Sequence, residues 1–231
     1  MASPAEQRFL ELLRKPIKTK EDMIEKEKAS AEFVKELRQE TKGLLDELKA
    51  VGIEIESVYD LVNTKASYPE AIPILIRHVP KAYHERNKDG IIRALTVKEA
   101  TGKANAVLIA EYHKTPKEKM NLRWVIGNAI YIIVTKADVE SIIPIVQDKE
   151  NGYTRDRFIL ALGKVKSEQA ENVLIKLLDD EEVVVQSAIE ALGRMKSTKA
   201  RGKIEQLLTA PKKEIRKEAE KALKKIDRSS K

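Results

Sequence analysis

The residues from 157 to 226 repeat themselves. Ala161-Leu162-Gly163 recurs as Ala191-Leu192-Gly193 and, without the glycine, as Ala222-Leu223. Around each alanine, apolar residues recur three and four positions apart, which predicts one face of an amphipathic α-helix. A second short apolar stripe precedes each of these helices, with turn or cap residues in between. Each unit is therefore predicted to be a helix pair that cannot bury its apolar face alone and must stack on its neighbours.

The pattern continues towards the N-terminus. The alanines of five successive units are Ala94, Ala129, Ala161, Ala191 and Ala222, which are 35, 32, 30 and 31 residues apart. Each is followed by Leu or Ile. A small side chain repeated in register predicts that the second helices of neighbouring units approach one another closely.

The repeats resemble a known family. The phrases AIPILIRHV (71–79), LLDDEEVVVQSAIEALGRM (177–195) and EIRKEAEKALKKI (214–226), with a period near thirty residues, resemble HEAT repeats of the short bacterial and archaeal type, which also occurs in phycobilisome bilin lyases. The resemblance covers roughly residues 57 to 227 and is strongest in the last three units. It implies an all-α fold, a right-handed α–α solenoid of about five HEAT-like helix pairs. It specifies function poorly, because this scaffold serves many uses.

Residues 1–56 differ in character from the solenoid, which is expected to span residues 57–231. A short opening helix is predicted to stop near Pro16, and one long helix rich in Glu and Lys is predicted from Glu21 to Val51, before Gly52. The apolar residues of the long helix form a heptad seam of only about two and a half heptads. The segment is interpreted as a helical cap that seals the open end of the solenoid, with a dimerisation or partner-docking helix as the alternative.

The composition excludes several kinds of chemistry. The sequence has no cysteine, which rules out disulfides, thiolate catalysis and Cys-ligated metals. The three histidines, His78, His84 and His113, lack the spacing of a metal pair and are expected at the surface or at repeat edges. There is no phosphate-binding loop, nucleophile elbow or dinucleotide motif. We therefore expect a protein that is not an enzyme and uses no metal or cofactor.

Hydropathy favours a cytoplasmic protein. No apolar run approaches the length that is needed to span a bilayer, and the N-terminus lacks the apolar region of a signal peptide. Neither the oligomeric state nor the pathway can be derived from these features.

The net charge of +7 is unevenly distributed. It amounts to −2 for residues 1–56, +6 for 57–136, −4 for 137–196 and +7 for 197–231. Two basic blocks therefore flank an acidic middle, whereas a nucleic-acid-binding protein is expected to carry a continuous basic stripe.

A column of cations recurs within the repeats. Six residues before each repeat alanine stand Lys88, Arg123, Arg155, Val185 and Arg216. Helical geometry places this column at the edge of the buried stripe. The cations either pair with acids of neighbouring units, as a structural ladder, or form a row on the concave surface that faces phosphates or an acidic partner. Partial burial at the stripe edge favours the ladder.

Trp124 is the only tryptophan and a candidate anchor for a partner, with packing as the alternative. The candidate binding residues on the concave face are Lys88, Arg123, Trp124, Arg155, Arg157 and Arg216. The predicted function is a non-catalytic scaffold or adaptor that binds a macromolecular partner, in the first place a protein, on the concave face. The alternatives are a nucleic-acid-binding HEAT protein of DNA-glycosylase-like architecture that uses the cation column, or a HEAT-type lyase or accessory subunit. Trp124, Tyr131, Tyr153, Asp156 and Arg157 could be neighbours, but they do not match the glycosylase motif residue by residue.

Overall fold

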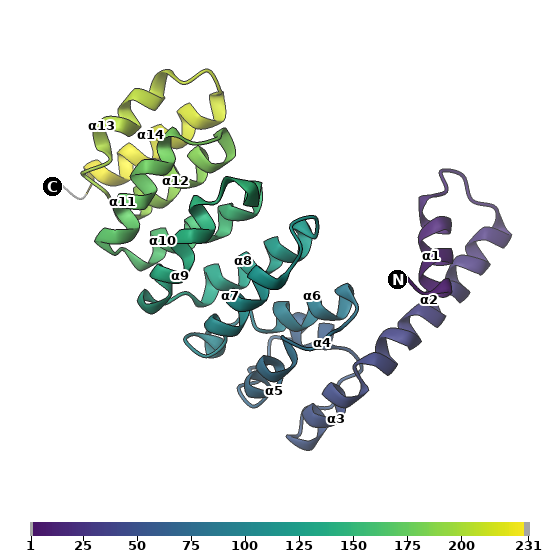
Figure 1. Cartoon of the computed structure of the whole chain (residues 1–231). Helices are drawn as coiled ribbons and strands as arrows, with labels where there is room; N and C mark the ends of the chain where they lie inside the picture. The colour runs from purple at the N-terminus through teal and green to yellow at the C-terminus, as the bar shows by residue number, and fades with distance from the viewer. Residues whose placement is uncertain (1, 229–231) are drawn as a thin grey trace.

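The computed structural model describes residues 2–228 of the chain. This part contains fourteen α-helices, five 3-10 helices and no strand (Figure 1). The α-helices are α1 (Pro4–Arg14), α2 (Lys20–Glu40), α3 (Lys42–Ala50), α4 (Val58–Asn63), α5 (Ala71–His78), α6 (Glu85–Ala94), α7 (Asn105–Lys114), α8 (Met120–Ile133), α9 (Val139–Gln147), α10 (Asp156–Val165), α11 (Glu168–Lys176), α12 (Glu182–Met195), α13 (Arg201–Gln206) and α14 (Lys213–Asp227). The 3-10 helices are η1 (Lys98–Ala100), η2 (Lys136–Asp138), η3 (Lys149–Arg155), η4 (Leu177–Asp179) and η5 (Leu207–Thr209).

Five helix pairs form the stack, namely α5–α6, α7–α8, α9–α10, α11–α12 and α13–α14. The second helices pack against one another in order, from α6 to α14. In Figure 1 the second helices lie on the side of the stack that faces the α1–α2 hairpin, and the first helices lie on the opposite side. The predicted all-α, right-handed α–α solenoid of about five helix pairs is confirmed.

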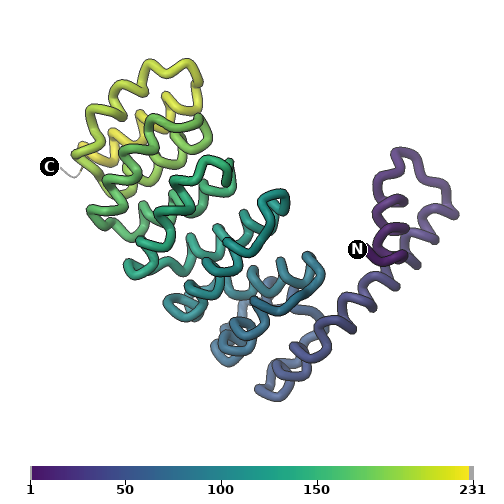
Figure 2. The backbone as a smooth tube through the Cα atoms, in the orientation of Figure 1, coloured from purple at the N-terminus to yellow at the C-terminus, as the bar shows by residue number. Residues whose placement is uncertain are grey.

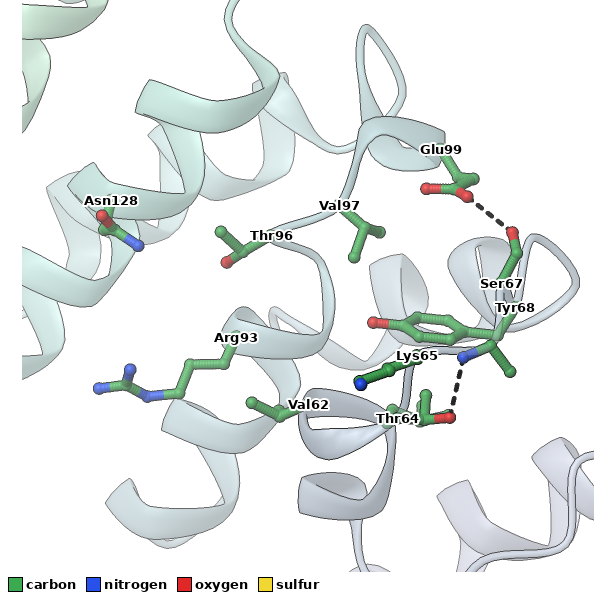
Figure 3. A pocket seen from close by; sticks show the side chains of 12 residues that line it. Val62, Thr64, Lys65, Ser67, Tyr68, Arg93, Thr96, Val97, Glu99 and Asn128 are labelled. Atoms are coloured by element: carbon green, nitrogen blue, oxygen red, sulfur yellow. Dashed lines mark hydrogen bonds between the residues drawn. The ribbon is translucent and has the colours of Figure 1, made fainter.

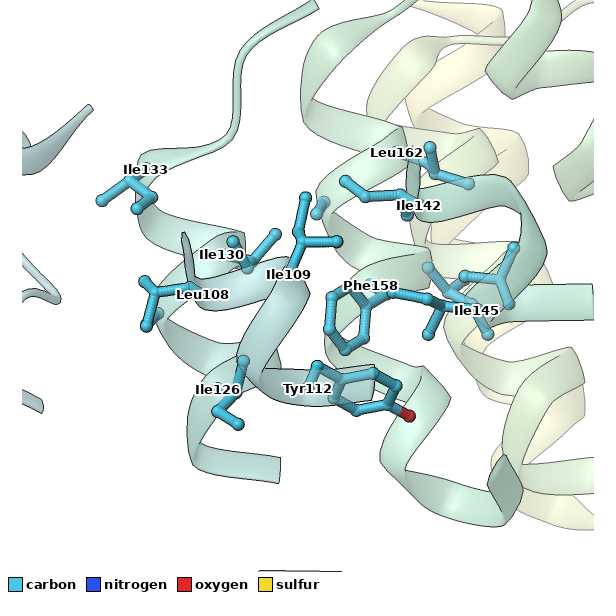
Figure 4. Close-up of a cluster of buried hydrophobic side chains, with 14 of the residues drawn as sticks. Leu108, Ile109, Tyr112, Ile126, Ile130, Ile133, Ile142, Ile145, Phe158 and Leu162 are labelled. Carbon is cyan, nitrogen blue, oxygen red and sulfur yellow. The ribbon is translucent and has the colours of Figure 1, made fainter. Parts of the chain in front are cut away.

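The core is a ribbon of mostly aliphatic side chains that runs between the layers. Figure 4 shows the part between the second and third pairs, where Tyr112 of α7 and Ile126 of α8 lie near Phe158 of α10. The rings of Tyr112 and Phe158 meet edge to face, with their centroids 4.7 Å apart. Burying each large aliphatic side chain contributes about 1.5–3 kcal/mol. Stability is therefore spread along the stack and depends on contacts between successive pairs.

Glycine and alanine set the distance between the second helices. A Cβ atom added to Gly163 of α10 would lie 2.7 Å from the Cβ of Ala191 in α12. A Cβ added to Gly193 would lie 2.8 Å from the Cβ of Ala222 in α14. The close approach predicted from the recurring alanine is confirmed at these two interfaces.

The helix predicted from Glu21 to Val51 is divided into two, which corrects that prediction. The hydroxyl of Thr41 donates to the carbonyl oxygen of Leu37 at 3.0 Å, and such bonding to the preceding turn bends helices. The chain leaves α2 at this residue and starts α3, whose Leu44 and Leu48 are fully buried in the main core. The other predicted boundaries hold, since α1 ends before Pro16 and Gly52 follows α3 with a φ of 84°.

The α1–α2 hairpin has a small core of its own. Phe9 and Phe33 bring α1 and α2 together, with ring centroids 6.4 Å apart, whereas the main core begins only at Leu44. The tip of the hairpin projects from the stack in Figure 2, while Phe33 contacts His84 at the start of α6, with ring centroids 5.3 Å apart. Ile17 and Ile24 on it are exposed. The assignment of residues 1–56 to a cap or to a docking segment stays a prediction.

Across residues 2–228, none of the helices combines the length and apolar character required to cross a lipid bilayer.

Candidate functional site

Three cations of the repeat column are buried inside the stack. Lys88, Arg123 and Arg155 are 7%, 4% and 0% exposed. Each side chain donates to a backbone carbonyl at the end of the first helix of its own pair. The acceptors are, in the same order, the carbonyl oxygens of Val79, Thr115 (3.0 Å) and Val146 (3.1 Å).

The same three cations also reach the next pair. Lys88 contacts the Glu111 carboxylate at 2.8 Å, Arg123 contacts the Asn151 side-chain oxygen, and Arg155 contacts the Asp180 carboxylate at 3.1 Å. We call these three contacts the inter-repeat ladder. Burial and occupied donors make its cations inaccessible to a ligand, which corrects their placement on an open concave face.

The fourth interface has apolar residues at both positions of this polar contact. Val185 stands in the column and is 5% exposed. At the position equivalent to Asp180, which follows η4, Ala210 follows the 3-10 helix η5. The cation and its partner are therefore lost together, which indicates that the pair acts as a unit.

The remaining three candidate residues are partly exposed, and two of them lie together. The Arg157 guanidinium stacks over the Trp124 ring, with its carbon 4.8 Å from the ring centroid. Arg216 lies in the last pair, where it donates to the carbonyl oxygens of Ala210 and Pro211, both at 2.7 Å. Trp124 and Arg157 therefore belong to one surface. Arg216 lies apart from them, in the last pair of the stack.

Further aromatic, amide and cationic side chains join Trp124 and Arg157 on the second helices. We call this surface the second-helix row. It consists of Arg93 on α6, Asn121, Trp124, Asn128 and Tyr131 on α8, Arg157 and Lys164 on α10, and Arg194 on α12. Arg194 donates to the Tyr131 hydroxyl at 2.6 Å, and the Lys164 ammonium donates to the Tyr131 carbonyl oxygen at 2.7 Å. These contacts tie three second helices into one surface.

Sequence reasoning missed Arg93, Asn121, Asn128, Lys164 and Arg194 as members of this surface. Arg93 and Asn128 each stand one residue before a repeat alanine, so the helical column next to the core stripe carried a signal for them. Of the possible neighbours named from the sequence, the structure brings Trp124 together with Asp156 and Arg157, and Tyr153 lines the same hollow as Trp124.

Arg93 lies between two hollows. One, of about 410 Å³, is lined by residues that include Lys65, Tyr68, Val97 and Asn128 (Figure 3). The other, of about 450 Å³, lies along α6 and α8 and is lined by Asp89, Arg93, Asn121, Trp124, Val125 and Tyr153. The Arg93 Nε donates to Asp89 at 2.6 Å. Within residues 2–228, neither the terminal nitrogens of Arg93 nor the amides of Asn121 and Asn128 have a hydrogen-bond partner, so these groups can bind a ligand.

Asp156 and Arg157 form an ion pair next to Trp124, with the Asp156 Oδ2 atom 3.6 Å from the Arg157 Nε atom. Burial raises the pKa of Asp156, against the opposing effects of Arg157 and of a hydrogen bond from Trp124. The Oδ1 of Asp156 and the Nε of Arg157 are buried without a hydrogen-bond partner. The row thus offers π faces, guanidinium groups and amides, which are groups suited to recognition. Among the described residues, no cluster of His, Asp or Glu is arranged to hold a metal ion.

His78 is buried at the edge of the first helix pair, so of its two expected places, the surface and a repeat edge, it takes the second. It closes the last turn of α5 beneath α3 and is 2% exposed. Its Nε2 lies 2.9 Å from the Glu47 carboxylate, and its Nδ1 contacts the Tyr83 hydroxyl. The histidine therefore ties α3 to the first pair of the stack.

Glu47 is expected to make the stability of the folded state depend on pH in the acidic range. Hydrogen bonds from His78 and Arg77 lower the pKa of Glu47 from 4.5 to about 2. The charged carboxylate therefore stabilises the folded state above pH 4.5, and this contribution is lost as the pH falls from 4.5 through about 2. We expect the melting temperature of the wild type to fall more steeply across this window than that of Glu47→Gln. Equal slopes in thermal unfolding followed by circular dichroism would contradict this assignment.

Comparison with known proteins agrees with this architecture. The family profile for HEAT repeats matches residues 139–227. Residues 139–227 therefore carry HEAT repeats. A designed armadillo repeat protein in complex with the peptide (KR)4 is similar to this chain with a TM-score of 0.50 and 18% identity, over 97% of this chain and 100% of that chain. The crystal structure of an engineered protein is similar with a TM-score of 0.49 and 22% identity, over 81% of this chain and 96% of that one. A comparison with curated proteins finds no match.

Proposed function

We propose that this protein is a non-catalytic adaptor whose second-helix row binds an extended segment of a protein partner. One observation carries the proposal. Asn121 and Asn128 lie seven residues apart on α8, on either side of Trp124, and neither amide has a hydrogen-bond partner within the described residues. Each amide offers a donor and an acceptor, as the backbone of an extended peptide requires.

The spacing suits a peptide. Seven residues of an α-helix rise about 10 Å, so the two amides are separated by roughly three residues of extended chain. Trp124 between them can contact a side chain of the peptide. The inter-repeat ladder fixes the second helices relative to one another, so little entropy is lost when the surface is occupied. The designed protein of similar fold carries a bound peptide, which supports this class of ligand.

The nucleic-acid alternative has less support. It relied on Lys88, Arg123 and Arg155, whose side chains are buried and occupied. The cations left on the row, such as Lys164 and Arg194, already bind Tyr131. A backbone-phosphate interface needs several free cations along one path.

Selection from a random peptide library tests the proposed function. Peptides enriched on the wild type should bind with micromolar affinity in fluorescence anisotropy and shift the emission of Trp124, the only tryptophan. Trp124→Ala should weaken binding by about thirtyfold, the effect of a typical anchor residue, and Asn128→Ala should weaken it by about tenfold. Asn172→Ala, at an exposed position on the first helix α11, serves as the control and should leave binding unchanged.

Two results would refute the proposal. One is a selection that enriches no peptide. The other is tight binding of duplex DNA or RNA whose affinity falls steeply with salt, which would favour the nucleic-acid alternative.

A further inference from the structure

We infer that the partner segment is acidic and that Arg93 selects it by binding a side-chain carboxylate between the two hollows. This inference rests on the proposed function and specifies the chemistry of the partner. Arg93 is the residue that both hollows share. Any chain that passes from one hollow to the other must therefore cross its guanidinium group.

Arg93 is held in place for this contact. Its Nε donates to the Oδ2 atom of Asp89 at 2.6 Å, and the hydroxyl of Tyr59 donates to the same oxygen at 2.8 Å. The guanidinium group is thereby anchored on one edge. Its terminal nitrogens have no hydrogen-bond partner among the described residues. A planar fork of free N–H groups matches the two oxygens of a carboxylate.

A second cation lies beside Arg93. Lys65 lines the same hollow as Arg93, and within residues 2–228 its ammonium group has no ion-pair partner (Figure 3). The lining of this hollow thus holds two cations and one carboxylate, that of Glu99, which accepts a hydrogen bond from Ser67 at 2.6 Å. Further along the row, Lys164 donates to two carbonyl oxygens and lies over a ring face. An acidic segment would supply carboxylates to Lys65 and to the free edge of Arg93, whereas a basic segment would face both cations.

The second hollow adds an apolar requirement. Its wall contains Trp124, Val125 and Tyr153, and Tyr153 is 41% exposed. The aromatic side of this hollow, opposite in character to Asp89, Arg93 and Asn121, can accept an aliphatic or aromatic side chain. The expected motif is therefore an Asp or Glu close to a large apolar residue. The peptide (KR)4, which the designed armadillo protein binds, has the wrong charge for this surface and serves as a negative probe.

Parallel selections on the wild type, Arg93→Gln and Arg201→Gln test this inference. Each peptide of the library is fused at both of its ends, so that it has no free C-terminal carboxylate. Only side chains then supply carboxylates. Arg201 is the matched control, because it is also an ion-paired arginine but lies on the first helix α13. Peptides enriched on the wild type and on Arg201→Gln should carry an acid beside an apolar residue, and Arg93→Gln should not enrich them.

Synthetic peptides give the quantitative test. Arg93→Gln should weaken an enriched peptide by roughly 10- to 100-fold in anisotropy, as expected for a lost hydrogen bond to a charged group. Replacing the acidic residue of the peptide with its amide should weaken binding by the same factor. The amide peptide and Arg93→Gln combined should weaken binding no more than either change alone. Circular dichroism checks that Arg93→Gln remains folded.

The outcomes separate the two proposals. Enriched peptides without acids that still depend on Trp124 and Asn128 would overturn the inference and leave the proposed function standing. Acidic peptides that bind Arg93→Gln as well as the wild type would also overturn it. A selection that enriches nothing would refute the proposed function and the inference together.

Discussion

Arg155→Ala is expected to lower the free energy of unfolding by about 3–5 kcal/mol, which is the usual effect of removing one partner of a buried ion pair. Arg155 is 0% exposed, and the side chain of its partner Asp180 is 8% exposed. Burial alone would raise the pKa of Asp180, but the hydrogen bonds from Arg155 and from the Glu181 N–H outweigh it and lower that pKa. The substitution leaves Asp180 as a buried charge without its cation, and it leaves the carbonyl oxygen of Val146 without its donor. Urea denaturation followed by circular dichroism measures the loss.

The chain itself supplies the control. In the next interface Val185 replaces the arginine and Ala210 replaces the aspartate. The double variant Arg155→Val/Asp180→Ala copies this apolar pair, so it should recover much of the stability that Arg155→Ala loses. A loss below about 1 kcal/mol for Arg155→Ala, the range of a surface ion pair, would show that the ladder carries little of the stability.

The inter-repeat ladder connects stability to the proposed function. Arg123 lies inside the stack with its guanidinium carbon 4.0 Å from the Tyr112 ring centroid, and the next residue, Trp124, lies on the row. The same turn of α8 therefore carries a structural cation and a surface aromatic. Variants at Arg123 should affect binding through folding, whereas variants at Trp124 should affect binding directly. This distinction explains why a basic column in a repeat sequence is weak evidence for nucleic-acid binding.

The sequence predicted the solenoid well because its periodic features determine local structure. The spacing of the repeat alanines gave the helix pairs, and the column six residues before them gave the ladder cations. The break at Thr41 was not predictable from periodicity, since the heptad seam continues through it to Leu44 and Leu48. The Thr41 hydroxyl bends the helix locally, and the tertiary contact of α3 with α5, which no periodicity shows, holds α3 in place after the bend. The two hollows beside Arg93 depend on side chains from loops and helices that no repeat pattern aligns.

Gly163→Val is expected to lower the free energy of unfolding by about 3 kcal/mol, at the upper end of the usual cost of overpacking a core. Even a Cβ atom at this position would lie 2.8 Å from the backbone Cα of Ala191, so α10 and α12 must move apart. Gly202 is the matched control, because it lies in the helix α13 with nothing within 4 Å of an added Cβ. Valine there should change stability by no more than about 0.5 kcal/mol.

The alanine variants sharpen this test, because helix propensity alone favours Ala over Gly by about 1 kcal/mol. Gly202→Ala should therefore stabilise the protein, and Gly163→Ala should destabilise it. Gly163→Val should also weaken binding of an enriched peptide, since Arg194 on α12 reaches Tyr131 on α8 across the helix that carries Gly163. Urea denaturation and anisotropy on the same samples measure both effects. A stabilised Gly163→Ala would mean that the second helices are free to separate, and the row could not then act as a preformed surface.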